Sequence, residues 1–337
     1  MDERFPRNSV ASRPPFAVGQ LAVVALTMLV AHALCLTQYG WFRDELYYAS
    51  CARRLAWGYV DHPPLSIGVL ALVRALFGDG LVAPRLVAAL ASALVSLAAA
   101  AIARELGGRR YAQVLAALAL GIAPLSLAVG HYFSLNVFDL LFWSLATLLA
   151  LRAFESESRA LWAALGLTLG LGLLNKWSVL WLGCGLAVAL LVSPHRKRLL
   201  GKGPWLAAGI AAALFAPNLI WEQLHAWPTL EFMHNARTQK MAALDPLKYL
   251  LDLVLAMGPG GAPLWLAGLV AAFAHARWRP LAIVFAVTLT ILFASGSARV
   301  EYLALATPAL FAAGATWWET RGRFARGAIA TAAIALA

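Results

Sequence analysis

Charged residues and cysteines are both scarce in this sequence. Asp, Glu, Lys and Arg together make up 13% of the 337 residues, whereas hydrophobic residues make up 62%. This balance lies outside the range of a water-soluble domain and indicates a membrane protein. The three cysteines, Cys35, Cys51 and Cys184, have no paired spacing, so neither a disulfide framework nor a cysteine metal site is predicted.

Several longer patterns are also missing. No HExxH motif occurs and the histidines have no ligand spacing, so no metal is predicted, although a divalent ion is not excluded. No Gly/Ser-rich linker or internal repeat divides the chain, which predicts one membrane-embedded domain over residues 1–337 and counts against transporters built from two inverted halves. The net charge of +11 is scattered in short clusters between apolar runs, which argues against a nucleic-acid partner.

What the sequence does contain is a series of apolar runs. A bilayer core of roughly 30 Å needs about 20 apolar residues per helix. The sequence therefore predicts an all-α, polytopic transmembrane bundle of about ten or eleven spans. An eleventh helix is expected from near Gly327, where the remaining apolar run is too short to cross. The ten spans are expected at 16–38, 82–103, 111–129, 135–152, 160–174, 177–193, 204–220, 249–273, 280–296 and 302–318.

The distribution of Lys and Arg predicts the orientation of these spans. With a cytoplasmic N-terminus, 17 of the 27 basic residues fall in the short inner connections, as the positive-inside rule requires. The two long connections, 39–81 and 221–248, are then placed outside. We expect a cytoplasmic (inner) membrane protein whose working groups face the periplasm or the exterior.

The first outer loop begins with two adjacent acids, Asp44 and Glu45, directly after the first span. Residues 44–57 have the pattern of an amphipathic helix lying on the membrane surface. These acids are candidates for catalysis, but an ordinary alternative makes Asp44 a helix cap with equal weight. The loop then breaks at Asp61, His62 and two prolines, and His62 is either a phosphate contact or a passive surface residue. The apolar run 65–77 is too short to cross and predicts a second interfacial helix.

Other polar groups also fall at the outer ends of predicted spans. Burying Asp139 in a span is costly. Asp139 is therefore either a functional residue or part of a buried pair with an arginine such as Arg85. Lys176 occupies a short outer turn and either binds phosphate or extends its ammonium group to the interface. Glu231 lies in the aromatic second outer loop, whose composition suits either sugar binding or interfacial anchoring. Arg299 either faces an anionic ligand or pairs with its neighbour Glu301.

These residues together resemble bacterial members of glycosyltransferase family 39, the protein mannosyltransferase and aminoarabinose transferase-like enzymes of the GT-C superfamily. The resemblance covers nearly the whole chain, including the surroundings of Asp139. Its other carriers are RDELYY (43–48), GYVDHPPL (58–65), RELGG (104–108), GLGLLNKW (170–177) and PNLIW (217–221).

The resemblance implies that Asp44 is the base-like carboxylate, Glu45 its acidic partner and Asp139 a second essential acid. His62 stands where the aminoarabinose branch carries a lysine thought to meet the lipid phosphate, so phosphate recognition here is expected to be weaker or pH-sensitive. The resemblance also implies a donor in which a sugar such as galacturonate, aminoarabinose or mannose is linked to polyprenyl phosphate. The acceptor would be lipid A, another glycan or a protein.

The expected mechanism is a single inverting step, in which Asp44 takes the proton of the acceptor hydroxyl as polyprenyl phosphate leaves. The compensating charge would come from Lys176, Arg299 and His62, without an obligatory metal cofactor. The exposed basic groups Arg53, Arg54 and Arg74 would suit phosphate or uronate oxygens.

Two alternatives to this enzyme remain open. One is a transporter or flippase that uses Asp139 and Lys176 as intramembrane groups, and the other is a noncatalytic assembly subunit. The clustering of ionisable groups at the outer ends of helices favours the enzyme, since a relay needs such groups through the depth of the bundle.

Overall fold

The fold consists of helices throughout the part of the chain that the structure describes. The computed structural model describes residues 13–240 and 243–336, and no strand occurs within them. The predicted all-α class is therefore confirmed. Four helices are long and apolar enough to cross a membrane: α1 (Val18–Cys35), α4 (Val82–Glu105), α7 (Leu135–Phe154) and α10 (Lys202–Leu224).

Two further spans are bent pairs of helices. α5 (Arg110–Gly121) and α6 (Pro124–His131) meet at 63°, and α13 (Ala262–Ala274) and α14 (Arg279–Ser295) meet at 111°. Two apolar helices, α8 (Arg159–Asn175) and α9 (Val179–Val192), are shorter than a full span. Counted by length and composition, the described residues therefore contain four to six spans, fewer than the expected ten or eleven.

Three expected spans are each divided in the structure, and the first of them, 111–129, is the bent pair α5 and α6. The predicted helix 249–273 is α12 (Pro246–Ala256) and α13, separated at a Gly-Pro-Gly-Gly turn in which Gly258 has a φ of +80°. A chain with this turn cannot continue as one helix, because proline lacks the N–H and a positive φ departs from helical geometry. The predicted helix 302–318 is α15 (Val300–Ala304) and α16 (Thr307–Glu319). The last helix, α17 (Arg323–Ala335), follows.

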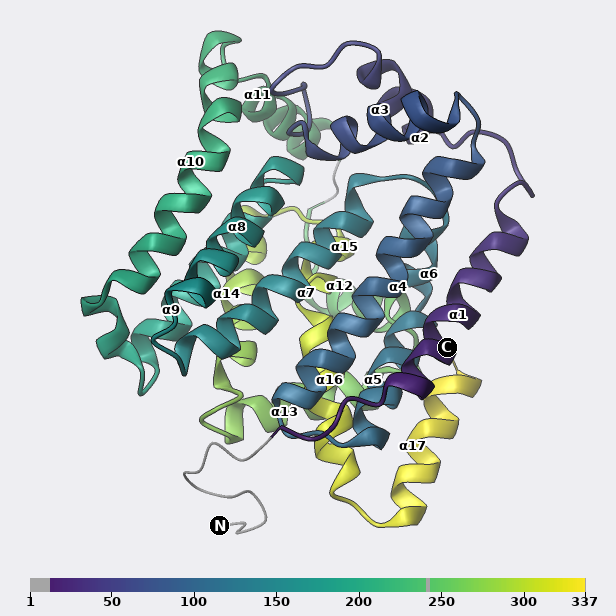
Figure 1. Ribbon diagram of the computed structural model, residues 1–337, viewed down its shortest axis with the longest axis vertical. Helices are drawn as coiled ribbons and strands as arrows, with labels where there is room; N and C mark the ends of the chain where they lie inside the picture. The colour runs from purple at the N-terminus through teal and green to yellow at the C-terminus, as the bar shows by residue number, and fades with distance from the viewer. Residues whose placement is uncertain (1–12, 241–242, 337) are drawn as a thin grey trace.

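Three helices of the two long connections gather at one end of the bundle. Figure 1 shows α2 (Arg43–Ala52), α3 (Leu65–Phe77) and α11 (Pro228–Asn235) together at its top. We call this the loop end. The predicted helix at 65–77 is thus confirmed, whereas the one expected at 44–57 ends earlier, at Ala52. A 3₁₀ turn, η1 (Arg196–Leu200), precedes α10, and a π-helical turn, η2 (Ala236–Lys240), follows α11.

The two long connections contact each other at the loop end. Asn218, near the end of α10, donates from Nδ2 to the carbonyl of Trp57 at 2.8 Å. Thr229 of α11 donates to the carbonyl of Tyr59 at 3.5 Å. Gly58 lies between them against the face of Trp221, where an added Cβ would come within 2.3 Å of the indole ring. The absence of a side chain at Gly58 therefore allows this contact between the loops.

A buried glutamate joins several segments at the opposite end. Glu105, at the end of α4, is 2% exposed and accepts from Arg13 at 2.8 Å and from Arg152 of α7 at 2.7 Å. Arg277, in the turn between α13 and α14, lies 3.7 Å from the same carboxylate. Glu105 thus neutralises part of the charge of three arginines. They lie at the end of the bundle that the sequence predicts to be cytoplasmic.

The interior is packed mainly with alanine and leucine, and glycines at some helix crossings allow the backbones to approach closely. The tightest crossing lies between α13 and α16. A Cβ added to Gly268 would lie 2.0 Å from the carbonyl oxygen of Leu310, and one added to Gly314 would lie 1.9 Å from that of Leu264. Both obstacles are backbone atoms, so side-chain movement cannot relieve the overlap.

We therefore expect Gly268→Ala and Gly314→Ala each to destabilise the protein by at least about 1–3 kcal/mol, the usual cost of overpacking. The matched control is Gly209→Ala on α10, where no atom lies within 4 Å and alanine favours the helix. Thermal unfolding of the purified protein in detergent measures the difference. Equal stability of the three variants would contradict the assignment of this close crossing.

Candidate functional site

Asp44 lies at the loop end, in the first turn of α2. Its side chain is 32% exposed and accepts a hydrogen bond from Nε of the exposed neighbour Arg43 at 3.0 Å. A carboxylate at a helix N-terminus is stabilised in its charged form by the backbone N–H groups. Asp44 is therefore a surface-accessible anion with free acceptor capacity, which is what a general base requires.

Glu45 differs from its neighbour because it is almost completely buried. Its carboxylate is 2% exposed and accepts from Nε and Nη2 of Arg85 at 3.0 and 2.7 Å. The same two oxygens accept from the backbone N–H groups of Phe42 at 2.9 Å and Phe133 at 3.0 Å. Four donors thus hold Glu45 in place, and its geometry is that of an anchor for α2.

Arg85 extends this anchor to the end of α1. Its side chain is fully buried in α4 and also donates to the carbonyls of Leu36, Tyr39 and Gly40. Its guanidinium lies 4.3 Å from the centre of the Tyr39 ring. The Glu45–Arg85 pair therefore fixes the connection between α1 and α2, and with it the position of Asp44.

Asp139 is fully buried in the outer part of α7. The alternative in which it pairs with Arg85 is wrong, because Arg85 is taken by Glu45. The hydroxyl of Ser178 donates to Asp139, with its oxygen 2.7 and 2.8 Å from the two carboxylate oxygens. Nζ of Lys176 lies 3.5 Å from Oδ2. Asp139 is thus a paired anion that orients the turn between α8 and α9.

Lys176 connects this buried pair to the surface of the site. It caps the C-terminus of α8, is 22% exposed, and donates from Nζ to the amide oxygen of Asn136 at 2.9 Å. Nζ also lies 5.2 Å from the centre of the Tyr302 ring. A cavity of about 20 Å³, enough for one water molecule, opens beside it. Its lining residues are Leu125, Val129, Asn136, Leu140, Lys176, Glu301, Ala304 and Leu305.

Tyr132 links Asp44 to this cavity. Its ring lies 4.5 Å from that of Phe42, next to the start of α2, and its side chain interacts with Asn136. Burial raises the pKa of the Tyr132 hydroxyl, and the carboxylates of Asp44 and Glu301 raise this pKa further. Tyr132 thus lies between Phe42, next to Asp44, and Asn136, which lines the cavity beside Lys176.

Three residues of this site are absent from the sequence-based prediction: Tyr132, Asn136 and Ser178. Asn136 lies three residues before Asp139, a spacing that puts both on one helix face. Ser178 lies two residues after Lys176 in the same turn. Asn136 could have been inferred from helix spacing, and Ser178 from its place in the same turn as Lys176. Tyr132 could not have been inferred, because its position depends on the path of the chain between α6 and α7.

His62 is neither a surface residue nor in contact with the Lys176 cavity. Its side chain is 1% exposed and packed by the rings of Tyr47, Tyr48 and Tyr59. Nε2 lies 3.6 Å from Asp61, which accepts a hydrogen bond from Tyr47 at 2.6 Å. Burial lowers the pKa of His62 below its usual 6.5, and Asp61 opposes this only in part. His62 is therefore a neutral packing residue in this conformation.

The remaining predicted contacts lie on the surface. Arg53 and Arg54 follow α2, Glu231 lies on α11 and Arg299 precedes α15, and all four side chains are exposed. Within the described residues, none of these side chains forms a hydrogen bond or an ion pair. The ion pair between Arg299 and Glu301, one of the two alternatives from the sequence, is therefore not formed. The structure therefore leaves their proposed roles as predictions.

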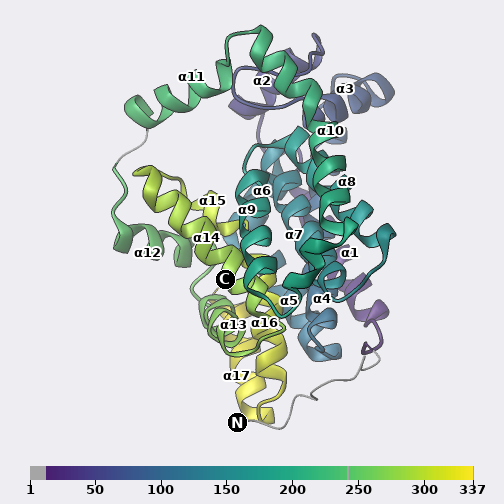
Figure 2. The same ribbon diagram turned by 90° about the vertical axis from the view of Figure 1, so that its left-hand side faces the viewer.

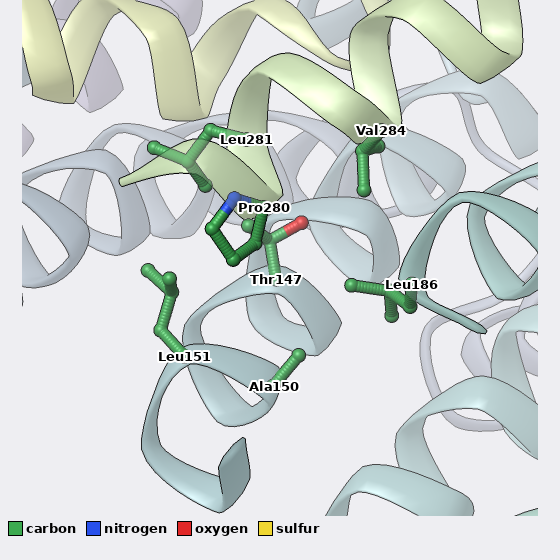
Figure 3. Close-up of a pocket in the computed structure, with 7 residues that line it drawn as sticks. All are labelled: Thr147, Ala150, Leu151, Leu186, Pro280, Leu281 and Val284. Atoms are coloured by element: carbon green, nitrogen blue, oxygen red, sulfur yellow. The ribbon is translucent and has the colours of Figure 1, made fainter. Parts of the chain in front are cut away.

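A separate apolar crevice lies between α7, α9 and α14. Figure 3 shows its lining residues, Thr147, Ala150, Leu151, Leu186, Pro280, Leu281 and Val284. It has no room for a water molecule, so it is a packing defect and not a binding site. Among residues 13–240 and 243–336, no group of three His, Cys, Asp or Glu side chains is arranged to hold a metal ion.

Comparison with known proteins places these features in context. Residues 61–221 match the family model described as dolichyl-phosphate-mannose-protein mannosyltransferase. The lipid A galacturonosyltransferase RgtD of Rhizobium johnstonii is 27% identical over 213 residues, which cover 61% of this chain and 44% of that protein.

Solved structures with the same arrangement of helices extend over more of the chain. ArnT from Cupriavidus metallidurans bound to undecaprenyl phosphate matches with a TM-score of 0.78 and 20% identity, covering 93% of this chain and 62% of that one. The Archaeoglobus fulgidus oligosaccharyltransferase matches with a TM-score of 0.62 and 13% identity, covering 89% and 50%. The resemblance predicted from the sequence is confirmed, and the chain spans less than two thirds of the length of each of these relatives.

The anchor at Glu45 gives the first prediction from the site. Arg85→Met leaves a buried carboxylate without its cation and is expected to destabilise the protein by about 3–5 kcal/mol. The exposed Arg53→Met serves as the control for loss of an arginine. Adding Glu45→Gln to Arg85→Met is expected to restore part of the loss in a thermal unfolding measurement. The anchor is contradicted if Arg85→Met is as stable as Arg53→Met.

The lowered pKa of His62 gives a second prediction. Between pH 6.5 and its lower folded pKa, the unfolded chain binds a proton that the folded chain does not. Stability contributed by neutral His62 is therefore present above pH 6.5 and is lost as the pH falls, by at most about 1.4 kcal/mol per pH unit. His62→Phe should weaken this pH dependence in thermal unfolding, whereas the exposed His234→Phe should not. An unchanged slope in His62→Phe would contradict the assignment.

Proposed function

We propose that this chain, which has the fold of the GT-C glycosyltransferases, is itself a glycosyltransferase that moves a sugar from a polyprenyl phosphate to an acceptor. The acceptor is a hydroxyl group of a lipid such as lipid A, of a glycan or of a protein. The relatives support this class of donor, since the ArnT structure holds undecaprenyl phosphate and the matched family model names dolichyl phosphate mannose.

One structural observation carries the proposal for this chain's own residues. Asp44 offers a partly exposed carboxylate next to Phe42, whose ring packs on Tyr132, and Lys176 offers a partly exposed ammonium group that donates to Asn136, the residue with which Tyr132 interacts. A transfer reaction needs a base for the acceptor and a positive charge for the departing phosphate. Asp44 and Lys176 have these two chemical properties.

In the proposed reaction, Asp44 accepts the proton of the acceptor hydroxyl as the acceptor oxygen attacks the anomeric carbon. The bond between that carbon and the phosphate oxygen breaks, and polyprenyl phosphate leaves with the electron pair. The anomeric configuration inverts because attack and departure occur on opposite faces. A positioned base of this kind contributes about 10² to 10⁴ in rate.

Lys176 stabilises the negative charge that develops on the departing phosphate. Its ammonium group is positioned by Asn136 and by the Asp139–Ser178 pair, so little reorganisation is needed when the phosphate arrives. Asp139 thus acts through Lys176 as a positioning residue. The exposed Arg299 is a second candidate for the phosphate, and Arg53, Arg54 and Glu231 remain candidates for the surrounding substrate and membrane surface.

The proposed location is the cytoplasmic membrane, with the site on its outer side. The two long connections and Asp44 lie at the loop end, whereas Arg13, Arg152 and Arg277 surround Glu105 at the other. The positive-inside rule supports this orientation. The position of the site at one end of the bundle also favours transfer over transport, which would need ionisable groups along the whole path.

Removal of the proposed base tests the function. Asp44→Asn is nearly isosteric and should reduce transfer from radiolabelled polyprenyl-phosphate sugars by about 10² to 10⁴. Asp79→Asn is the matched control, because Asp79 is a 73% exposed acid in the same outer loop and lies outside the site. The control should keep nearly full activity at equal amounts of folded protein. Undiminished transfer by Asp44→Asn would remove the proposed base, and no transfer by the wild type would favour a transporter or a noncatalytic subunit.

A further inference from the structure

A second carboxylate faces the cavity beside Lys176. Glu301 lies in the first turn of the short helix α15 and lines the cavity together with Asn136 and Lys176. Figure 2 shows α15 close to α12, on the side of the molecule below α11. Within the described residues, the Glu301 carboxylate accepts no hydrogen bond and forms no ion pair, although it is only partly exposed.

The charges around the cavity do not neutralise Glu301. Lys176 is already paired with Asp139 at 3.5 Å and donates to Asn136 at 2.9 Å. Among the described residues, Glu301 is therefore left without a cationic partner of its own. The remaining walls are apolar, with side chains that include Leu125, Val129 and Leu140. An unpaired carboxylate in such surroundings favours a ligand that donates hydrogen bonds.

The size of the cavity restricts what can approach Glu301. A volume of about 20 Å³ accepts one group of the size of a water molecule and not a sugar ring. A single hydroxyl or ammonium substituent fits this space, whereas a carboxylate is larger and carries a charge of the same sign as Glu301. Both size and charge therefore select against an acidic substituent at this position.

We propose that Glu301 is a specificity-determining residue that accepts a hydrogen bond from a hydroxyl or ammonium substituent of the transferred sugar. The inference rests on the proposed function, because it assumes that the sugar lies between Asp44 and Lys176. Tyr132 supports this placement, because its ring lies 4.5 Å from that of Phe42 next to Asp44, and its side chain interacts with Asn136, which lines the cavity.

The proposal reverses an expectation from the sequence. Arg53, Arg54 and Arg74 suggested an anionic sugar, but Arg53 and Arg54 are exposed and Arg74 pairs with Asp79. The charged groups that line the cavity are Lys176, which already has Asp139 as its partner, and the unpaired acid Glu301. A donor whose sugar carries a carboxylate at the position that Glu301 contacts should therefore be used poorly, which would distinguish this chain from its galacturonosyltransferase relative.

The test compares three polyprenyl-phosphate donors carrying a neutral hexose, an amino sugar and a uronic acid. The full chain in membranes should use the neutral or the amino donor with a higher kcat/KM than the uronic acid. Glu301→Gln should reduce kcat/KM for the better donor by about 10- to 100-fold, the range for a hydrogen bond to a charged group. The same variant should narrow the discrimination against the uronic acid. A larger loss with the amino donor than with the hexose identifies an ammonium group, and equal losses identify a hydroxyl.

Two controls separate specificity from folding and from the proposed function. Asp252→Asn removes an exposed acid from the neighbouring helix α12 and should leave the donor ratios unchanged. Glu301→Asp keeps the charge and should retain the order of donor preference even if Glu301→Gln folds poorly. Donor ratios that are the same in Glu301→Gln and wild type, or a wild type that prefers the uronic acid, would overturn the proposal. Absence of transfer from all three donors would instead reject the proposed function.

Discussion

The position of the site depends on one buried ion pair, between Glu45 of α2 and Arg85 of α4. Burying two charges is costly unless their remaining hydrogen-bonding capacity is used. Here Glu45 also accepts two backbone N–H groups and Arg85 also donates to three carbonyls, so the pair joins the end of α1, the start of α2, α4 and the chain before α7. Asp44 is adjacent to Glu45 and differs from it only in facing outward. The same anchor that immobilises one acid therefore presents the other to the surface.

A second buried pair performs the corresponding task on the other side of the site. Asp139 is held by Ser178 and lies beside Lys176, which itself remains partly exposed. In both pairs the buried acid positions its neighbourhood, while a partly exposed group next to it is available to a substrate. This division explains how a mostly apolar bundle can present a carboxylate and an ammonium group at one end while the buried acids Glu45 and Asp139 keep their partners.

Much of this arrangement could be predicted from the sequence, and the failures have physical causes. The lengths of the apolar runs and the spacing of the arginines predicted most of the helices and the two long connections at one end of the bundle. The helix at 65–77 was predicted to the residue. The division of 249–273 was missed because hydropathy was given more weight than the Gly-Pro-Gly-Gly turn within it. The pairing of Asp139 with Ser178 could not be predicted, since it joins segments 39 residues apart. The burial of His62 was missed because it depends on how the first outer loop folds back on Tyr47, Tyr48 and Tyr59. A local pair between Arg299 and Glu301 was one of two alternatives left open by the sequence, and the structure forms no such pair.

The most direct test of the account is the anomeric configuration of the transferred sugar, determined by NMR on a product made from a polyprenyl-phosphate donor of known configuration. A single displacement assisted by one base predicts the inverted configuration, with one polyprenyl phosphate released for each sugar transferred. A product with retained configuration would require a covalent sugar–protein intermediate and would contradict the role of Asp44 as a base. Passage of the intact donor across the membrane without bond cleavage would contradict the glycosyltransferase itself.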